Sequence, residues 1–409
     1  MGQLEKQLAS VLNKRQQIAK RRQLVVNSPT AIDFSSNDFL GLAQNTALRQ
    51  RYLNELESME TILGSTGSRL LDGNSQYAFD LERQIAQFHR ADTALLFNSG
   101  FDANTGLLST LPQKGDIVIY DELIHASVHE GMRVSRAGRL IPFKHSNVTD
   151  LDRVLTEIGS TDKNVFIAVE TVYSMDGDVV PLVEIVQLLR KYWPKKENGY
   201  IIVDEAHATG VYGENGRGVV CQLGLEKEIF ARLHTFGKSL ASNGAAVLGS
   251  NTLRDYLINY ARPLIYSTFM SFNSLASVKC AYDILECGET QEIQTHLHNI
   301  TRQFREAIQL PTGTLLPSDS PIQGIVLNGN APVRALAGYL NKRGFIVKPI
   351  CSPTVPKGQE RVRICLHGHN TAEQVDALVA SVHQFFNVQK SNMVASSTSV
   401  SNTLEPAKL

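Results

Sequence analysis

Three polar residues near the middle of the chain have the types and spacing that chemistry on an amine would need. Asp204 ends the apolar run YIIVD, His207 follows three residues later, and Lys238 lies farther on, in a turn flanked by Gly and Ser. Strand ends meet at one edge of a parallel sheet, so a carboxylate and a lysine placed there can share a cleft. Pyridoxal phosphate (PLP) enzymes use this combination: the lysine forms a Schiff base and the carboxylate pairs with the pyridinium nitrogen. His207 could then hydrogen-bond the phenolic oxygen of the ring.

Each of these residues also has an ordinary interpretation when it is taken alone. A strand-end aspartate is commonly a cap or a turn residue, and a single loop lysine is commonly solvated. The prediction of a PLP site therefore depends on Asp204, His207 and Lys238 occurring together.

A candidate phosphate site lies between an apolar run and a helical pattern. Ser99, Gly100 and Phe101 follow ALLF and Asn98 at the start of that helical pattern. Backbone N–H groups at a helix N-terminus, together with a Ser hydroxyl, can bind a phosphate. An ordinary strand–helix turn is the alternative interpretation.

Three further polar residues could face the same cleft. His125, in YDELIHASVHE, is either an exposed loop residue or an aromatic plate stacked on the cofactor ring. Glu170 and Ser174, in VETVYSMDGD, end another apolar run, and they either face the cleft or act in caps and turns.

The elements that must position these residues follow from the apolar patterns. Short apolar runs alternate with helical patterns from about residue 41 to 287, which predicts a mostly parallel sheet with helices on both faces. Within this large domain we expect helices at 78–88 and 181–192, and strands at 94–97, 116–120, 165–170, 200–206 and 245–249.

The flanking segments have different patterns. Residues 1–40 form an N-terminal arm in which 4–22 predicts an amphipathic helix, with a mitochondrial transit peptide as the alternative. Residues 288–387 predict a smaller α+β domain, with strands at 324–328, 344–350 and 361–366 and a final helix at 371–386. Residues 388–409 are rich in Ser, Thr and Asn, which predicts a disordered tail.

The composition limits the class of protein. The 409 residues include 40 Lys and Arg and 40 Asp and Glu, and this neutral balance argues against nucleic-acid binding, which needs a basic surface. No apolar run reaches about 18 residues, so we expect no membrane span. The five cysteines form no CxxC pair and no metal-ligand spacing, so we expect no metal site, reduced thiols and an intracellular enzyme.

Long motifs occur along most of the chain: FSSNDFLGL (34–42), FNSGFDAN (97–104), ETVYSMDGD (170–178), VDEAHATGVYGENGRG (203–218), TFGKS (235–239), LIYST (264–268) and PTVPKGQERVRI (353–364). They resemble those of the α-oxoamine synthases, PLP enzymes of fold type I that condense an amino acid with an acyl-CoA and release CO2. The resemblance implies an α/β large domain whose mostly parallel, seven-stranded-type sheet is sandwiched by helices, and a smaller α+β C-terminal domain. It also implies a homodimer with active sites at the interface.

The resemblance implies roles for the residues already singled out. Lys238 would carry the Schiff base, Asp204 would pair with the pyridinium nitrogen, and His125 would stack on the ring and polarise the thioester carbonyl. His207 and Ser174 would surround the phenolic oxygen, near Glu170. The phosphate would be held by Ser99, Gly100, Phe101 and Thr235, with Thr268 reaching it from the partner subunit.

Two residues resemble those that bind the carboxylate of the amino acid. These are Asn37 and Arg363, and the planar guanidinium of Arg363 suits bidentate pairing with a carboxylate. Arg361 lies two positions away on the same expected strand and points to the same face, so a register error could exchange the two arginines.

The substrates are only partly indicated. SSNDFLGL, SRLLDGN and SPTVPKG favour the branch that uses L-alanine and a pimeloyl thioester for biotin synthesis. Departures from the family pattern at 64–69 (GSTGSR) and 269–272 (FMSF), near the expected acyl-CoA path, leave the acyl group open. A glycine-using synthase, an aminotransferase and a non-catalytic partner subunit are alternatives, although such a subunit should have lost Lys238.

The last three residues carry a candidate address. Ala407, Lys408 and Leu409 resemble the peroxisomal SKL signal, which an import receptor binds. We therefore expect a peroxisomal protein, and a cytoplasmic one if the signal is not used.

Overall fold

The computed structural model describes residues 2–18, 20–195 and 197–400, with side chains described as far as residue 388. The chain divides into two compact units. The large unit comprises residues 36–298 and 367–369, and the small unit comprises the segments before 36, from 299 to 366 and after 369. The sequence predicted that the large domain begins near residue 41 and ends near residue 287. The second boundary instead falls inside one helix, α12 (Gln291–Ala307).

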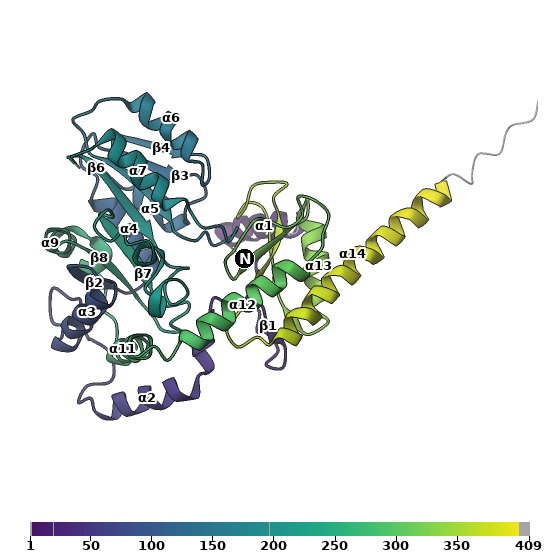
Figure 1. Ribbon diagram of the computed structural model, residues 1–409, viewed down its shortest axis with the longest axis horizontal. Helices are drawn as coiled ribbons and strands as arrows, with labels where there is room; N and C mark the ends of the chain where they lie inside the picture. Colours follow the sequence, from purple (N-terminus) through teal and green to yellow (C-terminus); the bar gives the residue numbers. More distant parts are fainter. Residues whose placement is uncertain (1, 19, 196, 401–409) are drawn as a thin grey trace, which may run out of the picture. The chain divides into compact units, whose positions relative to one another are not determined.

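A mostly parallel sheet forms the centre of the large unit (Figure 1). In the described part of the chain it has seven strands, in the order β2 (Thr93–Phe97), β8 (Ala245–Gly249), β7 (Ala231–Thr235), β6 (Gly199–Asp204), β5 (Val165–Glu170), β3 (Ile117–Asp121) and β4 (Arg139–Phe143). β8 is antiparallel to both of its neighbours, and the other pairs are parallel. The predicted α/β sheet is therefore confirmed.

Two strands of this sheet were not predicted. β4 contains Pro142, which cannot donate a ladder hydrogen bond but is tolerated because β4 lies at the sheet edge. β7 carries Arg232 and His234, both buried, so its sequence lacks a continuous apolar run.

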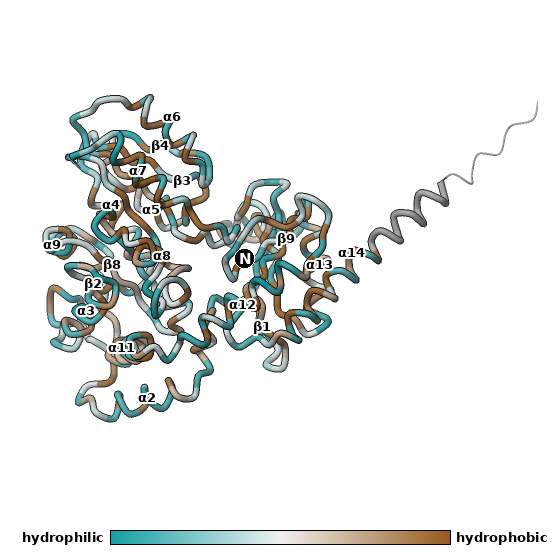
Figure 2. The backbone as a smooth tube through the Cα atoms, in the orientation of Figure 1, coloured by the Kyte–Doolittle hydropathy of each residue, from teal (hydrophilic) through white to brown (hydrophobic). Residues whose placement is uncertain are grey.

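Helices cover both faces of the sheet because alternate strand residues point to opposite sides. Alternate residues of β3, β5 and β6 enter two separate apolar clusters. One cluster includes residues of α4 (Gly100–Thr110), α5 (Ala126–Arg133) and α9 (Asn251–Tyr260); the other includes α6 (Val148–Ile158) and α7 (Leu182–Tyr192). The central strands accordingly are largely hydrophobic in Figure 2.

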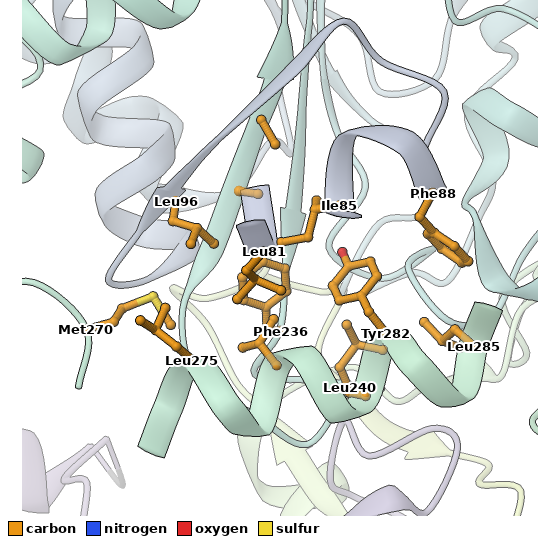
Figure 3. Packing of buried hydrophobic residues seen from close by; sticks show 14 of the residues in the cluster. Leu81, Ile85, Phe88, Leu96, Phe236, Leu240, Met270, Leu275, Tyr282 and Leu285 are labelled. Atoms are coloured by element: carbon orange, nitrogen blue, oxygen red, sulfur yellow. The ribbon is translucent and has the colours of Figure 1, made fainter. Parts of the chain in front are cut away.

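A third apolar cluster packs two helices against the antiparallel end of the sheet (Figure 3). Ile85 of α3 (Gln76–Phe88) and Tyr282 of α11 (Phe272–Glu286) pack there with Leu96 of β2. The large unit also contains η1 (Leu42–Gln44), α2 (Thr46–Glu57), η2 (Glu214–Gly216), α8 (Val219–Gln222) and α10 (Arg262–Ile265). None of the described helices is both long enough and apolar enough to cross a membrane.

The small unit is built around an antiparallel sheet of order β11 (Lys348–Ile350), β12 (Arg361–Cys365) and β9 (Ile322–Val326). The strand expected at 344–350 is divided in two, and its first part, β10 (Phe345–Ile346), pairs in parallel with β1 (Ile32–Asp33). The helices are α1 (Gln3–Gln17), α13 (Asn330–Asn341) and α14 (Ala372–Val400).

The C-terminal segment differs from its prediction. Residues 388–400 were expected to be disordered, but they continue α14, because no Gly or Pro interrupts the helix between Ala372 and Val400. The last nine residues, including the Ala407-Lys408-Leu409 signal, lie outside the described residues.

Candidate active site

The candidate site lies at the carboxyl ends of three adjacent parallel strands. Glu170 ends β5 and is the register partner of Asp204, which ends β6. Asp204 is in turn the register partner of Leu233 on β7, two residues before Thr235 ends that strand. Lys238 follows in the next turn, which is closed by a hydrogen bond from the Ala241 N–H to its carbonyl. The sheet thus brings together residues that are far apart in the sequence.

A chain of hydrogen bonds connects Asp204 to His125. Asn104 of α4 donates from Nδ2 to Asp204 Oδ2 at 2.7 Å and to Ser127 Oγ at 3.0 Å. Ser127 Oγ lies 2.7 Å from His125 Nδ1, and the other Asp204 oxygen accepts the Ala206 N–H at 2.9 Å. The two donors therefore fix the orientation of the Asp204 carboxylate. A carboxylate that pairs with a single ring nitrogen needs such a fixed orientation.

His125 is held as a neutral ring with a defined tautomer. Its Nδ1 accepts the backbone N–H of Ser127 at 3.2 Å, so the proton of the neutral imidazole lies on Nε2. Burial lowers the pKa of His125, the nearby Lys238 charge lowers it further, and Asp204 opposes the shift. The ring can therefore donate from Nε2 to a substrate oxygen near neutral pH.

Glu170 is buried in the same electrostatic environment. Burial raises the pKa of Glu170 well above its usual value, and the charge of Asp204 raises it further. Two groups oppose this rise in the pKa: the charge of Lys238, and a hydrogen bond that the backbone N–H of His125 donates to Glu170. The amine of Lys238 thus acts on both His125 and Glu170. We call Asp204, Lys238, His125 and Glu170, with Asn104 and Ser127, the strand-end cluster.

The N-terminus of α4 lies against the end of β7. Ser99 caps the helix by accepting the Asp102 N–H at 3.0 Å, and Gly100 begins it. A Cβ on Gly100 would lie 3.3 Å from Thr235 Oγ1, so glycine allows a close approach of the helix start to this hydroxyl. Asn98 donates to the carbonyl of Thr268 at 2.7 Å, which places Thr268 beside the same helix start. That Thr268 reaches the phosphate bound in the site of the partner subunit stays a prediction.

The remaining predicted residues occupy separate positions. His207 is buried, and the centre of its ring lies 5.9 Å from that of Phe39. Asn37, two residues before Phe39, is half-buried. Ser174 lies half-buried in the turn after β5. Arg363 lies on β12 of the small unit, and its role in binding a carboxylate stays a prediction. Arg361, on the same strand, donates from Nε to the carbonyl of Gln359 at 2.9 Å.

Sequence reasoning missed two members of the cluster, Asn104 and Ser127. Both are buried, and Asn104 lies among Ala103, Leu107 and Leu108 on the core face of α4. A buried polar side chain on an apolar helix face needs a hydrogen-bond partner, and this was the signal that could have identified Asn104. Ser127 follows His125 by two residues and offered no comparable signal.

The residues present fit PLP. The close approach of Gly100 to Thr235 leaves backbone donors at the start of α4 for a phosphate, and the directed Asp204 carboxylate suits a ring nitrogen. Lys238 is half-buried in the turn that follows β7.

Comparisons with known proteins agree with this geometry. The family model for aminotransferases of class I and II matches residues 29–382. An 8-amino-7-oxononanoate synthase from Emericella nidulans is 48% identical over 93% of this chain and 95% of its own length. An aminoacyl transferase (sphA) from Byssochlamys spectabilis is 38% identical over 90% of this chain and 84% of its own length.

A solved structure of serine palmitoyltransferase with the PLP internal aldimine is also similar to this chain. It has a TM-score of 0.82 and 26% identity, and the match covers 93% of this chain and 98% of that one. The chain thus belongs to the class I and II aminotransferases, which have the type I fold of PLP enzymes. Within them it is an α-oxoamine synthase, and its cofactor is PLP.

Proposed function

We propose that the chain condenses L-alanine with a pimeloyl thioester, giving 8-amino-7-oxononanoate, CoA and CO2 in biotin synthesis. The observation that carries the proposal is the strand-end cluster, in a chain that is 48% identical to an 8-amino-7-oxononanoate synthase over 93% of its length. The site has an amine, a directed carboxylate and a neutral histidine, and this reaction uses all three.

The proposed roles follow from the groups that each residue presents. When bound, PLP supplies an electron sink for the electron pair left on the Cα atom of alanine. The carboxylate of Asp204, held by Asn104 and the Ala206 N–H, binds the proton on the ring nitrogen. The Lys238 amine takes the Cα proton as general base.

Bond formation then follows a balanced course. The electron pair on Cα forms a bond to the thioester carbonyl carbon, the C–S bond breaks, and CoA leaves as a thiolate that takes a proton from solvent. The Nε2–H of His125 donates to the carbonyl oxygen during this step. Loss of CO2 returns an electron pair to Cα, and Lys238 returns the proton there. Asn37 and Arg363 are the residues we propose for the alanine carboxylate.

The test is a panel of amino acids against acyl-CoA thioesters of different chain length, with CoA release and product mass as readouts. We expect CoA release with L-alanine and pimeloyl-CoA, and a product of the mass of 8-amino-7-oxononanoate. CoA release with glycine but not alanine, or turnover that requires an amine-accepting keto acid, would contradict the proposal.

A second candidate is an α-oxoamine synthase with another acyl donor or with glycine. It is supported by the 38% identity to the Byssochlamys spectabilis aminoacyl transferase and by the two departing segments. These segments pair with each other: Ser65 Oγ donates to the carbonyl of Phe269 at 2.9 Å, and the Phe272 N–H donates to Leu63 at 2.9 Å. We call residues 63–69 and 269–272 the paired segments. A non-catalytic subunit has no comparable support, since Lys238 and Asp204 are both present. An aminotransferase would keep the same two residues, and the keto-acid requirement in the panel above tests it.

We propose a homodimer as the assembled enzyme. Exposed apolar side chains of Val134, Tyr260 and Tyr266 line one surface hollow of about 780 Å³ beside Arg262, and such a surface suits burial against a second copy. Light scattering of the purified protein tests this directly. A mass of one chain at micromolar concentration would contradict it.

The peroxisomal address also stays a proposal, supported by the resemblance of Ala407-Lys408-Leu409 to SKL. A fluorescent fusion at the N-terminus should enter peroxisomes, and the same fusion without the tripeptide should remain in the cytoplasm. Equal distribution of the two fusions would contradict import through this signal.

A further inference from the structure

A second buried carboxylate lies immediately after Asp204 and takes no part in the proposed chemistry. Glu205 is fully buried, and its side chain contacts different elements from those that the Asp204 side chain contacts. Glu205 Oε1 accepts the Val220 N–H of α8 at 3.0 Å. The other oxygen, Oε2, lies 3.6 Å from Nε2 of His234, which is fully buried on the neighbouring strand β7. Within the described part of the chain, neither of these two atoms has a hydrogen-bond partner at ordinary distance.

The hydrogen bonds around His234 define the tautomer that the proposal below assigns to it. The hydroxyl of Thr209 donates its single proton to the carbonyl of Glu205 at 2.8 Å. With its proton directed at this carbonyl, Thr209 Oγ1 accepts from His234 Nδ1, which lies 2.9 Å away. With a proton on Nδ1, a neutral His234 ring presents a bare lone pair on Nε2 to the Glu205 carboxyl group.

In this tautomer one proton lies between Glu205 and His234, because two bare acceptors at this distance in a buried site would repel. The proton can give an imidazolium with a carboxylate, or a neutral imidazole with a neutral carboxylic acid. The surrounding groups decide between them. The His89 ring stacks on His234 with centroids 3.8 Å apart, and Arg232 of β7 lies nearby.

These neighbours favour the neutral pair. Burial, His89 and the Arg232 charge all lower the pKa of His234 well below its usual value. Burial raises the pKa of Glu205 to about 7; Asp204 adds to this rise, while Arg232 and the Val219 and Val220 N–H groups oppose it. Cys221 of α8 also lies beside this pair, and burial raises its pKa to about 11.

We propose that Glu205 is a neutral carboxylic acid whose O–H is directed at His234 Nε2, 3.6 Å away, and that this pair positions the PLP site. Glu205 follows Asp204 directly, and His234 precedes Thr235 on the strand that leads to Lys238, so the shared proton connects the two chain segments that carry the cofactor contacts. A neutral Glu205 also avoids a second buried negative charge next to Asp204. Both residues are positioning residues, and the inference depends on the PLP site but not on the identity of the acyl donor.

Close packing leaves little freedom for the pair. A Cβ on Gly218 would lie 2.4 Å from Glu205 Oε2, and Gly218 has a φ of +96°, so the chain passes the carboxyl group at a position that only glycine suits. The geometry of the proton is therefore set by the fold around it.

Glu205→Gln tests the protonation state, because the amide reproduces the neutral acid: its oxygen accepts the Val220 N–H and its N–H donates to His234 Nε2. The native protein holds the Glu205 proton up to about pH 7, whereas the unfolded chain releases it near the ordinary glutamate pKa of 4.5. Wild-type stability from this group therefore falls as the pH rises between these values, while the glutamine variant has no such loss. We expect the unfolding midpoint of the variant, relative to wild type, to rise between about pH 5 and about pH 8.

Glu82→Gln is the matched control. Glu82 is also buried, but it pairs with Arg69 and Arg254 and accepts the Leu96 N–H at 2.8 Å. Its glutamine variant should have a lower midpoint than wild type at neutral pH. A Glu205→Gln variant that is destabilised in the same way, with no gain as the pH rises, would overturn the neutral pair.

Two further measurements separate positioning from simple stability. In protein labelled with ¹⁵N-histidine, His234 should give the signals of a neutral ring protonated on Nδ1, and imidazolium signals would contradict the proposal. The PLP dissociation constant should stay near the wild-type value in Glu205→Gln but rise about tenfold or more in Glu205→Leu, which lacks both donor and acceptor. Equal PLP affinity in a folded Glu205→Leu variant would overturn the positioning role. Neither readout depends on acyl turnover, so failure here is distinguishable from failure of the proposed reaction.

Discussion

The strand-end cluster and the paired segments are built from different kinds of contact. In the cluster, four of the six side chains are buried, and side-chain hydrogen bonds link its members, as Asn104 does for Asp204 and Ser127. In the paired segments, the backbone N–H groups of Phe269 and Phe272 donate to the carbonyls of Gly67 and Leu63, and Leu63 remains 74% exposed although Ser65 and Phe269 are buried. A buried side-chain network fixes the position of each group, whereas a partly exposed backbone pair tolerates changes in side chain. We infer that the cluster determines the reaction and that the paired segments affect the choice of acyl group.

The largest expected effect is that of Lys238→Ala. Removing the amine removes both the attachment point of PLP and the proposed base, so kcat should fall about 10⁴-fold with every acyl-CoA. The far-UV circular dichroism spectrum of the variant checks that it folds. A folded variant that retains substantial turnover would show that another group performs the proton transfer.

The next effect concerns the support of Asp204. Asn104→Ala removes a donor from Asp204 and from Ser127, so the PLP dissociation constant should rise and kcat should fall, each about 10–100-fold. Asn259→Ala is the control, because Asn259 is exposed and donates only to a backbone carbonyl of its own helix. If the two variants behaved alike, the buried network would have no special role.

A stability effect with a defined pH dependence is expected at the end of β3. Burial opposes the charge of His145, but hydrogen bonds to Asp121 and Asp178 outweigh burial and raise the pKa of His145 to about 10. This contribution is fully present below the unfolded value of 6.5 and is lost as the pH rises through about 10. His145→Gln should therefore be most destabilised at acid and neutral pH, and denaturant unfolding should show the difference from wild type shrinking toward pH 10. A difference that does not change with pH would contradict the ion-pair account.

The smallest effect is expected in the paired segments. Ser65→Ala removes the hydrogen bond to Phe269, a loss of about 1 kcal/mol, and should change the relative kcat/KM for acyl-CoA chain lengths a few-fold. The PLP dissociation constant should stay at the wild-type value. A change in PLP affinity with unaltered acyl preference would contradict the division between the two regions.

The sequence predicted the parts of the cluster that end apolar strands. Asp204 and Glu170 follow continuous apolar runs, and the resulting sheet has the expected class. β7 was missed because buried Arg232 and His234 hide its strand pattern, although their side chains are satisfied by tertiary contacts. Tertiary context also decided the roles of residues such as Asn104, because a hydrogen bond across a hundred positions leaves no local pattern.

The tautomers and proton positions could not be predicted from the sequence at all. The state of His125 depends on the backbone N–H of Ser127 and on the Lys238 charge, and both depend on how the strand ends meet. The same holds for Arg363, whose assignment to a carboxylate depends on the motif alone.

The central claim is that Lys238 is the residue to which PLP attaches in the strand-end cluster. Borohydride treatment of the PLP-loaded enzyme, followed by peptide mass spectrometry, tests it most directly. We predict that the reduced cofactor is found on the peptide that contains Lys238. Finding PLP on a different lysine, or finding none bound, would contradict the account.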